Sequence, residues 1–193
     1  IFILHLEFPR FILNLKNEVP EYNLRNNWKK LTGFFPNNRP VKFVFMKDLE
    51  DPYYNQIVYV PTISYNFYDG LTPGIRLHNK TILDKPFIFE INPSYSSKSD
   101  NLSGSAIFVI NQNYRNSTLY NAKYSMSGSY FHYAQDATYL KLNPTVQLRI
   151  RQPNCRDNRK QLILFRQVIV NKEKSAFVTE NSPENYSVFD ARY

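Results

Sequence analysis

The chain has 193 residues, of which 42% are hydrophobic and 16% aromatic, and its formal net charge is +8. This length suits one ordinary domain. The mean hydropathy of −0.48 and the lack of any run near the ~20 apolar residues of a spanning helix argue against a helical membrane protein. The one cysteine excludes an internal disulfide framework and a zinc site of several cysteines.

Residues 1–40 are expected to form a linker or irregular N-terminal segment. The apolar residues 1–15 are interrupted by charges and a proline, and no basic stretch precedes them as it does in a signal peptide. We therefore interpret Ile1 as an internal cut and expect the chain to be a piece of a longer protein. Residues 17–40 are rich in Asn, Pro and charge and follow neither the helical nor the strand period.

Residues 41–193 predict an all-β domain. We expect an antiparallel up-and-down meander that forms part or all of an outer-membrane-type β-barrel, and we expect that barrel to be incomplete. Strands of alternating character are separated by turn sequences every ten to twenty residues, one of which contains Asp69, Gly70, Pro73 and Gly74. Successive hairpins of this kind are typical of a meander.

The clearest alternation runs through residues 120–130 and 138–151, which are expected to be antiparallel neighbours because residues 134–137 have the length of a hairpin loop. One face of this hairpin is apolar, and its candidate lipid-facing residues are Tyr120, Ala122, Tyr124, Met126, Tyr130, Leu140, Leu142, Val146, Leu148 and Ile150. The other face is hydrophilic, and its candidate lumen-facing residues are Lys123, Ser125, Ser127, Lys141, Thr145, Gln147 and Arg149.

Two features favour a membrane barrel over a soluble β-sheet protein. Both strands exceed the usual soluble length of about 5 or 6 residues and reach the roughly 9 to 11 that span a bilayer. Aromatic residues also cluster near the expected strand ends, as in interfacial girdles: Tyr65, Phe67, Tyr68, Tyr130, Phe131, Tyr133 and Tyr139. Prolines inside three expected strands, at Pro61, Pro93 and Pro144, count against a continuous ladder.

A soluble or periplasmic β-sandwich or barrel is the alternative. It would bind a ligand or partner through a basic face around Arg149 and Arg151. The two interpretations differ in what covers Tyr120, Tyr124 and Met126, which is protein in a closed sandwich and lipid in a barrel.

No catalytic motif is found in the sequence, so we expect no catalysis and no cofactor or metal within this segment. None of the three histidines, His5, His78 and His132, belongs to a His-Glu-x-x-His zinc motif. The basic residues are spread along the chain without a nucleic-acid motif, so no nucleic-acid partner is expected.

Several short stretches resemble the C-terminal, outer-membrane barrel-like region of large Bacteroidetes-type cell-surface proteins, whose N-terminal region is a gluzincin-type, zinc aminopeptidase-like domain. The similarity covers about residues 17–193. It is carried by residues 33–40 (GFFPNNRP), 65–74 (YNFYDGLTPG), 78–81 (HNKT), 129–134 (SYFHYA) and 156–161 (RDNRKQ).

The resemblance implies an anchoring role at the bacterial outer membrane. The implied partners are outer-membrane lipid and the rest of the same chain, namely the upstream domain and the remaining strands. The zinc ligands and the catalytic glutamate of that family belong to its N-terminal region, so no catalytic residue is carried over. A parent protein that is an active aminopeptidase, with this piece shaping access to it, stays open as a third possibility.

Overall fold

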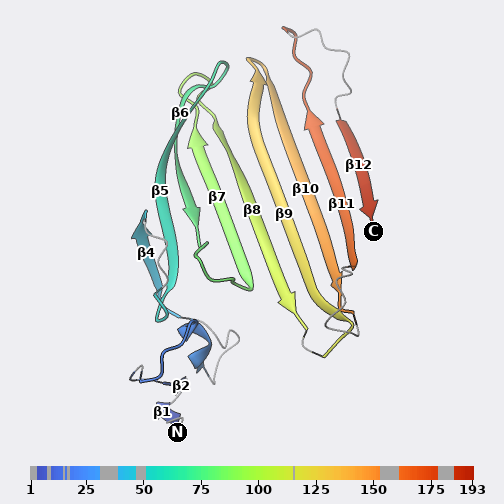
Figure 1. The fold of residues 1–193 in the computed structure, drawn as a ribbon. Helices are drawn as coiled ribbons and strands as arrows, with labels where there is room; N and C mark the ends of the chain where they lie inside the picture. The colour runs from blue at the N-terminus through green and yellow to red at the C-terminus, as the bar shows by residue number, and fades with distance from the viewer. Residues whose placement is uncertain are drawn as a thin grey trace.

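The computed structural model is dominated by one large, curved β-sheet (Figure 1). The structure describes residues 4–7, 10–14, 16, 18–30, 39–46, 51–114, 116–152, 161–177 and 185–193. The prediction of an all-β, antiparallel meander is confirmed. No helix within the described residues is both long and apolar enough to cross a membrane.

The large sheet has nine strands in the order β12-β11-β10-β9-β8-β7-β6-β5-β4. Its strands are β4 (Val41–Phe45), β5 (Asn55–Asn66), β6 (Gly70–His78), β7 (Phe87–Tyr95), β8 (Leu102–Asn113), β9 (Leu119–Ala134), β10 (Ala137–Ile150), β11 (Gln161–Lys172) and β12 (Asn185–Arg192). Neighbours from β5 to β12 are antiparallel, whereas β4 pairs with β5 in parallel. Within the described residues, β4 and β12 are the two edges of the sheet, and they do not pair with each other.

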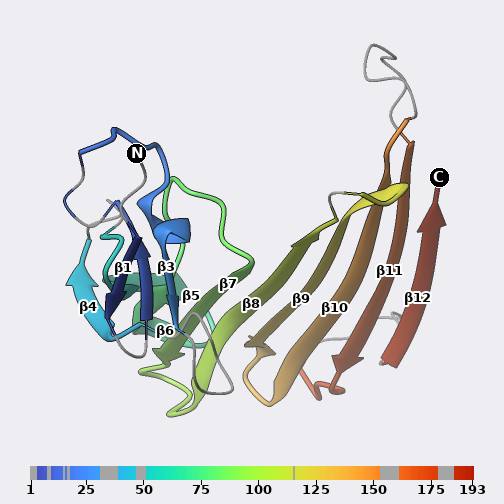
Figure 2. The same ribbon diagram turned by 90° about the horizontal axis from the view of Figure 1, so that it is seen from below.

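Residues 1–40 differ from the expected irregular segment. They contain a second sheet, made of β1 (Leu4–Glu7), β2 (Arg10–Leu13) and β3 (Trp28–Lys30), and a short 3-10 helix, η1 (Leu24–Asn27). This unit lies near the end of the large sheet where β5 begins (Figures 1 and 2). Strands of three or four residues are too short to show a period in the sequence, which is why the pattern missed them.

From Thr138 to Arg149 of β10, the register of the β9–β10 hairpin keeps the alternation of both strands in phase; it shifts between Ala137 and Thr138 and between Arg149 and Ile150. Tyr124 pairs with Val146 and Met126 with Pro144, whereas Ser127 pairs with Asn143 between them. The expected pairing is thus confirmed, with only Gln135 and Asp136 left between the two strands. We call the side of the sheet with Tyr124 and Met126 the apolar face, and the side with Lys123, Ser125 and Ser127 the polar face.

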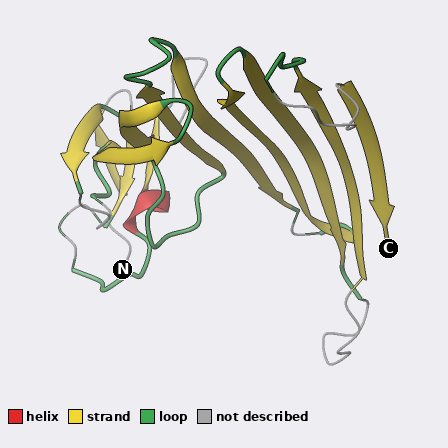
Figure 3. Ribbon diagram, turned by 90° about the horizontal axis from the view of Figure 1, so that it is seen from above, coloured by secondary structure: helices red, strands yellow, loops and turns green. Residues whose placement is uncertain are grey.

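The sheet bends into an arch, as the end-on views show (Figures 2 and 3). Glycines allow the close strand approach in this bend: a Cβ on Gly74 would lie 2.7 Å from the Pro93 carbonyl oxygen, and one on Gly104 would lie 2.2 Å from the Asn92 carbonyl oxygen. Gly104 also has a φ of 152°, which side chains rarely adopt. Glycine kinks of this kind introduce curvature into β-sheets.

The expected turn at residues 69–74 is only partly correct. Asp69 lies in the turn and Gly70 opens β6 with a φ of 71°, but Pro73 and Gly74 lie inside β6 and pair with Ile63 and Thr62. At Gly74 the missing side chain lets β7 approach the β6 backbone closely, so the Pro-Gly pair does not form a turn. Glycine inside a strand is often found where another backbone comes close.

We expect Gly104→Ala to destabilise the fold by about 1–3 kcal/mol, because the new methyl group would meet backbone at a strained φ. The free energy of unfolding, measured by urea titration, checks this. Gly128→Ala is the matched control, since its Cβ would meet the side-chain tip of Leu142 at 3.1 Å and backbone only at the ordinary contact distance of 3.6 Å, from the Lys141 carbonyl oxygen. Equal stability of the two variants would contradict the assigned role of Gly104.

Candidate functional site: a two-faced sheet

The charges of the large sheet are confined to its polar face. Every Asp, Glu, Lys and Arg within β5–β12 lies there by register. These residues are Arg76, Glu90, Lys123, Lys141, Arg149, Arg166, Lys172, Asp190 and Arg192. The apolar face of the same strands therefore has no formally charged Asp, Glu, Lys or Arg side chain along the whole span.

Most of the apolar face is uncovered by other described residues; only around Ile57, Phe87 and Phe89 do residues 23–25 and the loop before β7 border it. Tyr124 and Met126 are 41% and 49% exposed, and Ile63 on β5 is 75% exposed. The fully buried apolar side chains of the described chain form a small set: Val58, Ala122, Ala134, Ala137 and Val170. A contiguous apolar surface of this extent is rare on a soluble monomer and marks a surface that something covers.

The polar face lines the inside of the arch. Side chains from four adjacent strands border one hollow of about 400 Å³, and they include Thr62 of β5, Arg76 of β6, Glu90 of β7 and Ser105 of β8. Small polar groups bridge the strands around it, for example Ser64 Oγ to Thr72 Oγ1 at 2.6 Å. Thr72 and Glu90 on this face are only 4% and 7% exposed, against 75% for Ile63 on the apolar face, as expected for the inside of a curved sheet.

Two acidic residues on the polar face are each shared by two cations. Glu90, which is 7% exposed, lies 2.9 Å from Arg76 Nε and also contacts Lys80 Nζ. Asp190 lies 3.0 Å from Arg166 Nη2 and 2.9 Å from Arg192 Nη2. Each cluster therefore keeps one excess positive charge.

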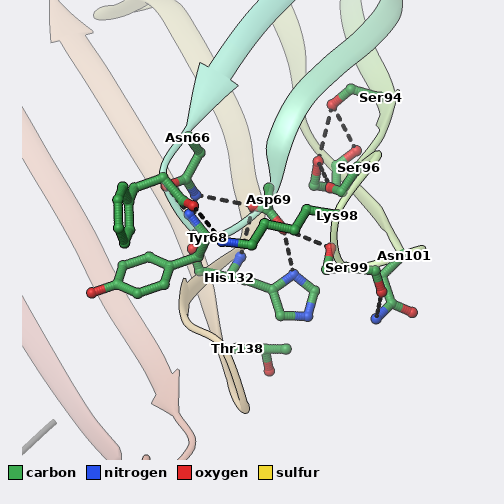
Figure 4. A network of polar contacts seen from close by, with 12 residues as sticks. Asn66, Tyr68, Asp69, Ser94, Ser96, Lys98, Ser99, Asn101, His132 and Thr138 are labelled. Atoms are coloured by element: carbon green, nitrogen blue, oxygen red, sulfur yellow. Dashed lines mark hydrogen bonds and ion pairs between the residues drawn. The ribbon is translucent and has the colours of Figure 1, made fainter. Parts of the chain in front are cut away.

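A buried polar network ties one end of the arch together (Figure 4). In a flat sheet β6 and β9 would be three strand spacings, about 14 Å, apart. Here Asp69, before β6, accepts a 3.3 Å hydrogen bond from the backbone N–H of His132 on β9, and the imidazole Nδ1 lies 2.8 Å from its carboxylate at ion-pair distance. Asn66 donates to both Asp69 and the His132 carbonyl, at 3.0 and 2.9 Å. The network thus joins the β5–β6 turn and the β7–β8 turn to the end of β9.

The pKa of the Asp69 carboxyl lies below the ordinary aspartate value. Burial of this carboxyl, which is 1% exposed, opposes ionisation. Hydrogen bonds from Ser99, from the His132 backbone and from Asn66 outweigh that cost, and the nearby His132 side chain adds to their effect. The donors from Asn66, Ser99 and the His132 backbone thus hold the Asp69 carboxylate in one position.

Aromatic side chains gather at this same end of the sheet. Tyr65 lies near the C-terminal end of β5. Tyr130 and Phe131 lie near the C-terminal end of β9, and Tyr139 lies near the start of β10. Phe131 and Tyr139 are in contact, with ring centroids 5.1 Å apart. Antiparallel order brings these strand ends together, although they are far apart in sequence.

The structure places the two predicted sets of residues on opposite faces of the β9–β10 hairpin. Leu140, Leu142, Val146 and Leu148 share the apolar face with Ala122, Tyr124, Met126 and Tyr130, and Lys141, Thr145, Gln147 and Arg149 share the polar face with Lys123, Ser125 and Ser127. A register shift between Arg149 and Ile150 pairs Ile150 with Leu119, so the pairing does not assign Ile150 and Tyr120 to the same face. The contact of these faces with lipid or with a lumen stays a prediction. Cys155 and most of residues 156–161 lie outside the described residues.

The pairing of Asp69 with His132 is a feature that the sequence did not reveal. The two residues are 63 positions apart, and each has an ordinary local interpretation, as a turn aspartate and as a histidine without a metal motif. No group of three or more His, Cys, Asp or Glu residues in the described part of the chain is arranged to hold a metal ion.

The chain matches no family model, no curated protein and no solved structure. What defines its class is therefore the fold and the segregated faces themselves, those of an all-β meander with one charged and one apolar surface.

We expect Asp69→Asn to cost about 1–3 kcal/mol of stability, because it removes the charge that three neighbours, Asn66, Ser99 and His132, stabilise. Since the folded pKa is lowered, the stabilisation is present at neutral pH and is lost as the pH falls through the folded pKa. Urea titrations from about pH 5 to about pH 2 should show an acid-dependent loss in the unmodified protein that the variant lacks.

Asp100→Asn is the control for this series. Asp100 lies in the neighbouring β7–β8 turn and accepts one exposed hydrogen bond, from Tyr95, and asparagine tolerates its φ of 53°. An acid profile of Asp69→Asn that matches that of Asp100→Asn would contradict the role given to the network.

Proposed function

We propose that the chain is a segment of an outer-membrane-type β-barrel whose function is to anchor a larger protein in the bacterial outer membrane. The observation that carries the proposal is the segregation of charge, with every Asp, Glu, Lys and Arg of β5–β12 on the concave face and none on the convex face. A lipid-exposed strand must satisfy its backbone through its neighbours and present apolar side chains outward, and the meander does both.

Strand length and aromatic placement support the same proposal. Five strands have 12 residues or more, with 16 in β9 and 14 in β10, and about 9–11 tilted residues cross a bilayer. Tyr65 and Tyr130, on the apolar face at one end of the sheet, are suited to an interfacial girdle, whereas Phe131 and Tyr139 lie on the polar face. In this proposal further strands or a second copy of the sheet complete the closure between β12 and the β5 side.

The anchored part belongs to the proposal as well. The resemblance to Bacteroidetes surface proteins suggests a zinc aminopeptidase-like domain upstream, and this segment contributes no catalytic residue and no cofactor to it. Its partners would be outer-membrane lipid, the upstream domain and the remaining strands of its own chain.

Localisation of the full-length protein tests the anchoring role. We expect it to sediment with the outer-membrane fraction and to resist extraction by alkaline carbonate, because the apolar face is solvated by acyl chains. Release of the full-length protein as a soluble monomer without detergent would contradict the proposal.

A pair of arginine substitutions tests which face meets lipid. Met126→Arg would put a charge on the apolar face at the middle of β9, where about 2–4 kcal/mol is expected for Arg at the bilayer midplane. Ser127→Arg, one residue along, would put the same charge on the polar face and is the matched control. We expect Met126→Arg alone to reduce folding into vesicles, measured by protease protection.

Equal loss in both variants, or a loss confined to Ser127→Arg, would contradict the assignment of the faces.

A further inference from the structure

The concave face carries an excess of positive charge, and part of this charge lies in a row along β10 and the adjacent strands β9 and β11. Four basic residues mark it, and we call them the basic lane: Lys123, Lys141, Arg149 and Arg166. Lys141 and Arg149 lie on β10, Lys123 lies opposite Gln147, and Arg166 lies opposite Thr145. At about 3.4 Å per residue, the lane extends over roughly 27 Å, which is close to the thickness of a bilayer core.

Acidic side chains do not neutralise the lane. No ion pair joins Lys123, Lys141 or Arg149 to an acidic group of the described residues. Arg166 shares Asp190 with Arg192, so this cluster keeps a positive charge. Glu90, the other acid of the polar face within these strands, is held by Arg76 and Lys80.

The residues between the cations are uncharged and polar. Ser125, Ser127 and Ser129 on β9 face Thr145, Asn143 and Lys141 on β10. Hydroxyl and amide groups offer hydrogen bonds to a passing solute without an opposing charge. No acidic group of the described residues pairs with Lys123, Lys141 or Arg149, so ion pairing within the fold does not account for the lane.

We propose that the basic lane makes the lumen of the barrel a path for small anionic solutes, such as those with carboxylate or phosphate groups. The inference rests on the proposed membrane barrel and names the class of solute that it passes. A concave surface of one charge, walled by a low dielectric, focuses the field and raises the local concentration of counter-ions. Basic side chains along a pore select anions in the same way.

Reversal potentials of the full-length protein in planar bilayers test the inference. With potassium chloride at unequal concentrations on the two sides, we expect the sign of an anion-selective pore, and the same sign with potassium phosphate. Lys141→Gln should shift the reversal potential toward zero, and the triple change of Lys123, Lys141 and Arg149 to Gln should shift it further.

Lys174→Gln is the matched control, because Lys174 is an exposed lysine beyond the end of β11 and outside the lane. It should leave the reversal potential nearly unchanged. Cation selectivity, an equal shift in both single variants, or a membrane-inserted protein that conducts no salt would overturn the inference and leave the anchor intact. A protein that stays out of membranes would overturn the proposed function itself.

Discussion

The register of the meander is the constraint on which the rest of the structure depends. Successive side chains of a strand point to opposite faces, so a slip of one residue between two neighbours would invert one strand and put charges on the apolar face. Apart from the shifts at the two ends of the β9–β10 pair, the printed pairings from β5 to β12 stay in phase, and apolar positions such as Ile91, Ala106, Gly128 and Leu142 align across the strands. The charge segregation is a direct result of that phase.

The large sheet is a single curved layer, held together mainly by the backbone hydrogen bonds between its strands and by polar contacts at one end. Few apolar side chains are buried in the described chain, so hydrophobic burial within the protein contributes less than in an ordinary soluble domain. The glycines at the bend permit the curvature, and we propose that the environment of the apolar face supplies the remaining stabilisation. In the proposed barrel that environment is lipid, and the concave side becomes an aqueous lumen.

Alternation of apolar and polar residues made the meander, the β9–β10 hairpin and its two faces predictable from the sequence. The alternation between Tyr120 and Arg151 is long enough to be distinguished from chance. The pattern could not show β1–β3, which are too short, or the role of Gly74, which depends on the approach of β7. It also could not pair Asp69 with His132 or find the basic lane, since both arise from contacts between strands distant in sequence.

Spin labels along β9 test the central claim, that the two faces meet different solvents. In a background with Cys155→Ser, a nitroxide would be placed in turn at Tyr124, Ser125, Met126 and Ser127 of the full-length protein in lipid vesicles. The account predicts collisions with oxygen at Tyr124 and Met126 and collisions with a water-soluble nickel complex at Ser125 and Ser127. Protection of Tyr124 and Met126 from both reagents would place them in a protein core and contradict it.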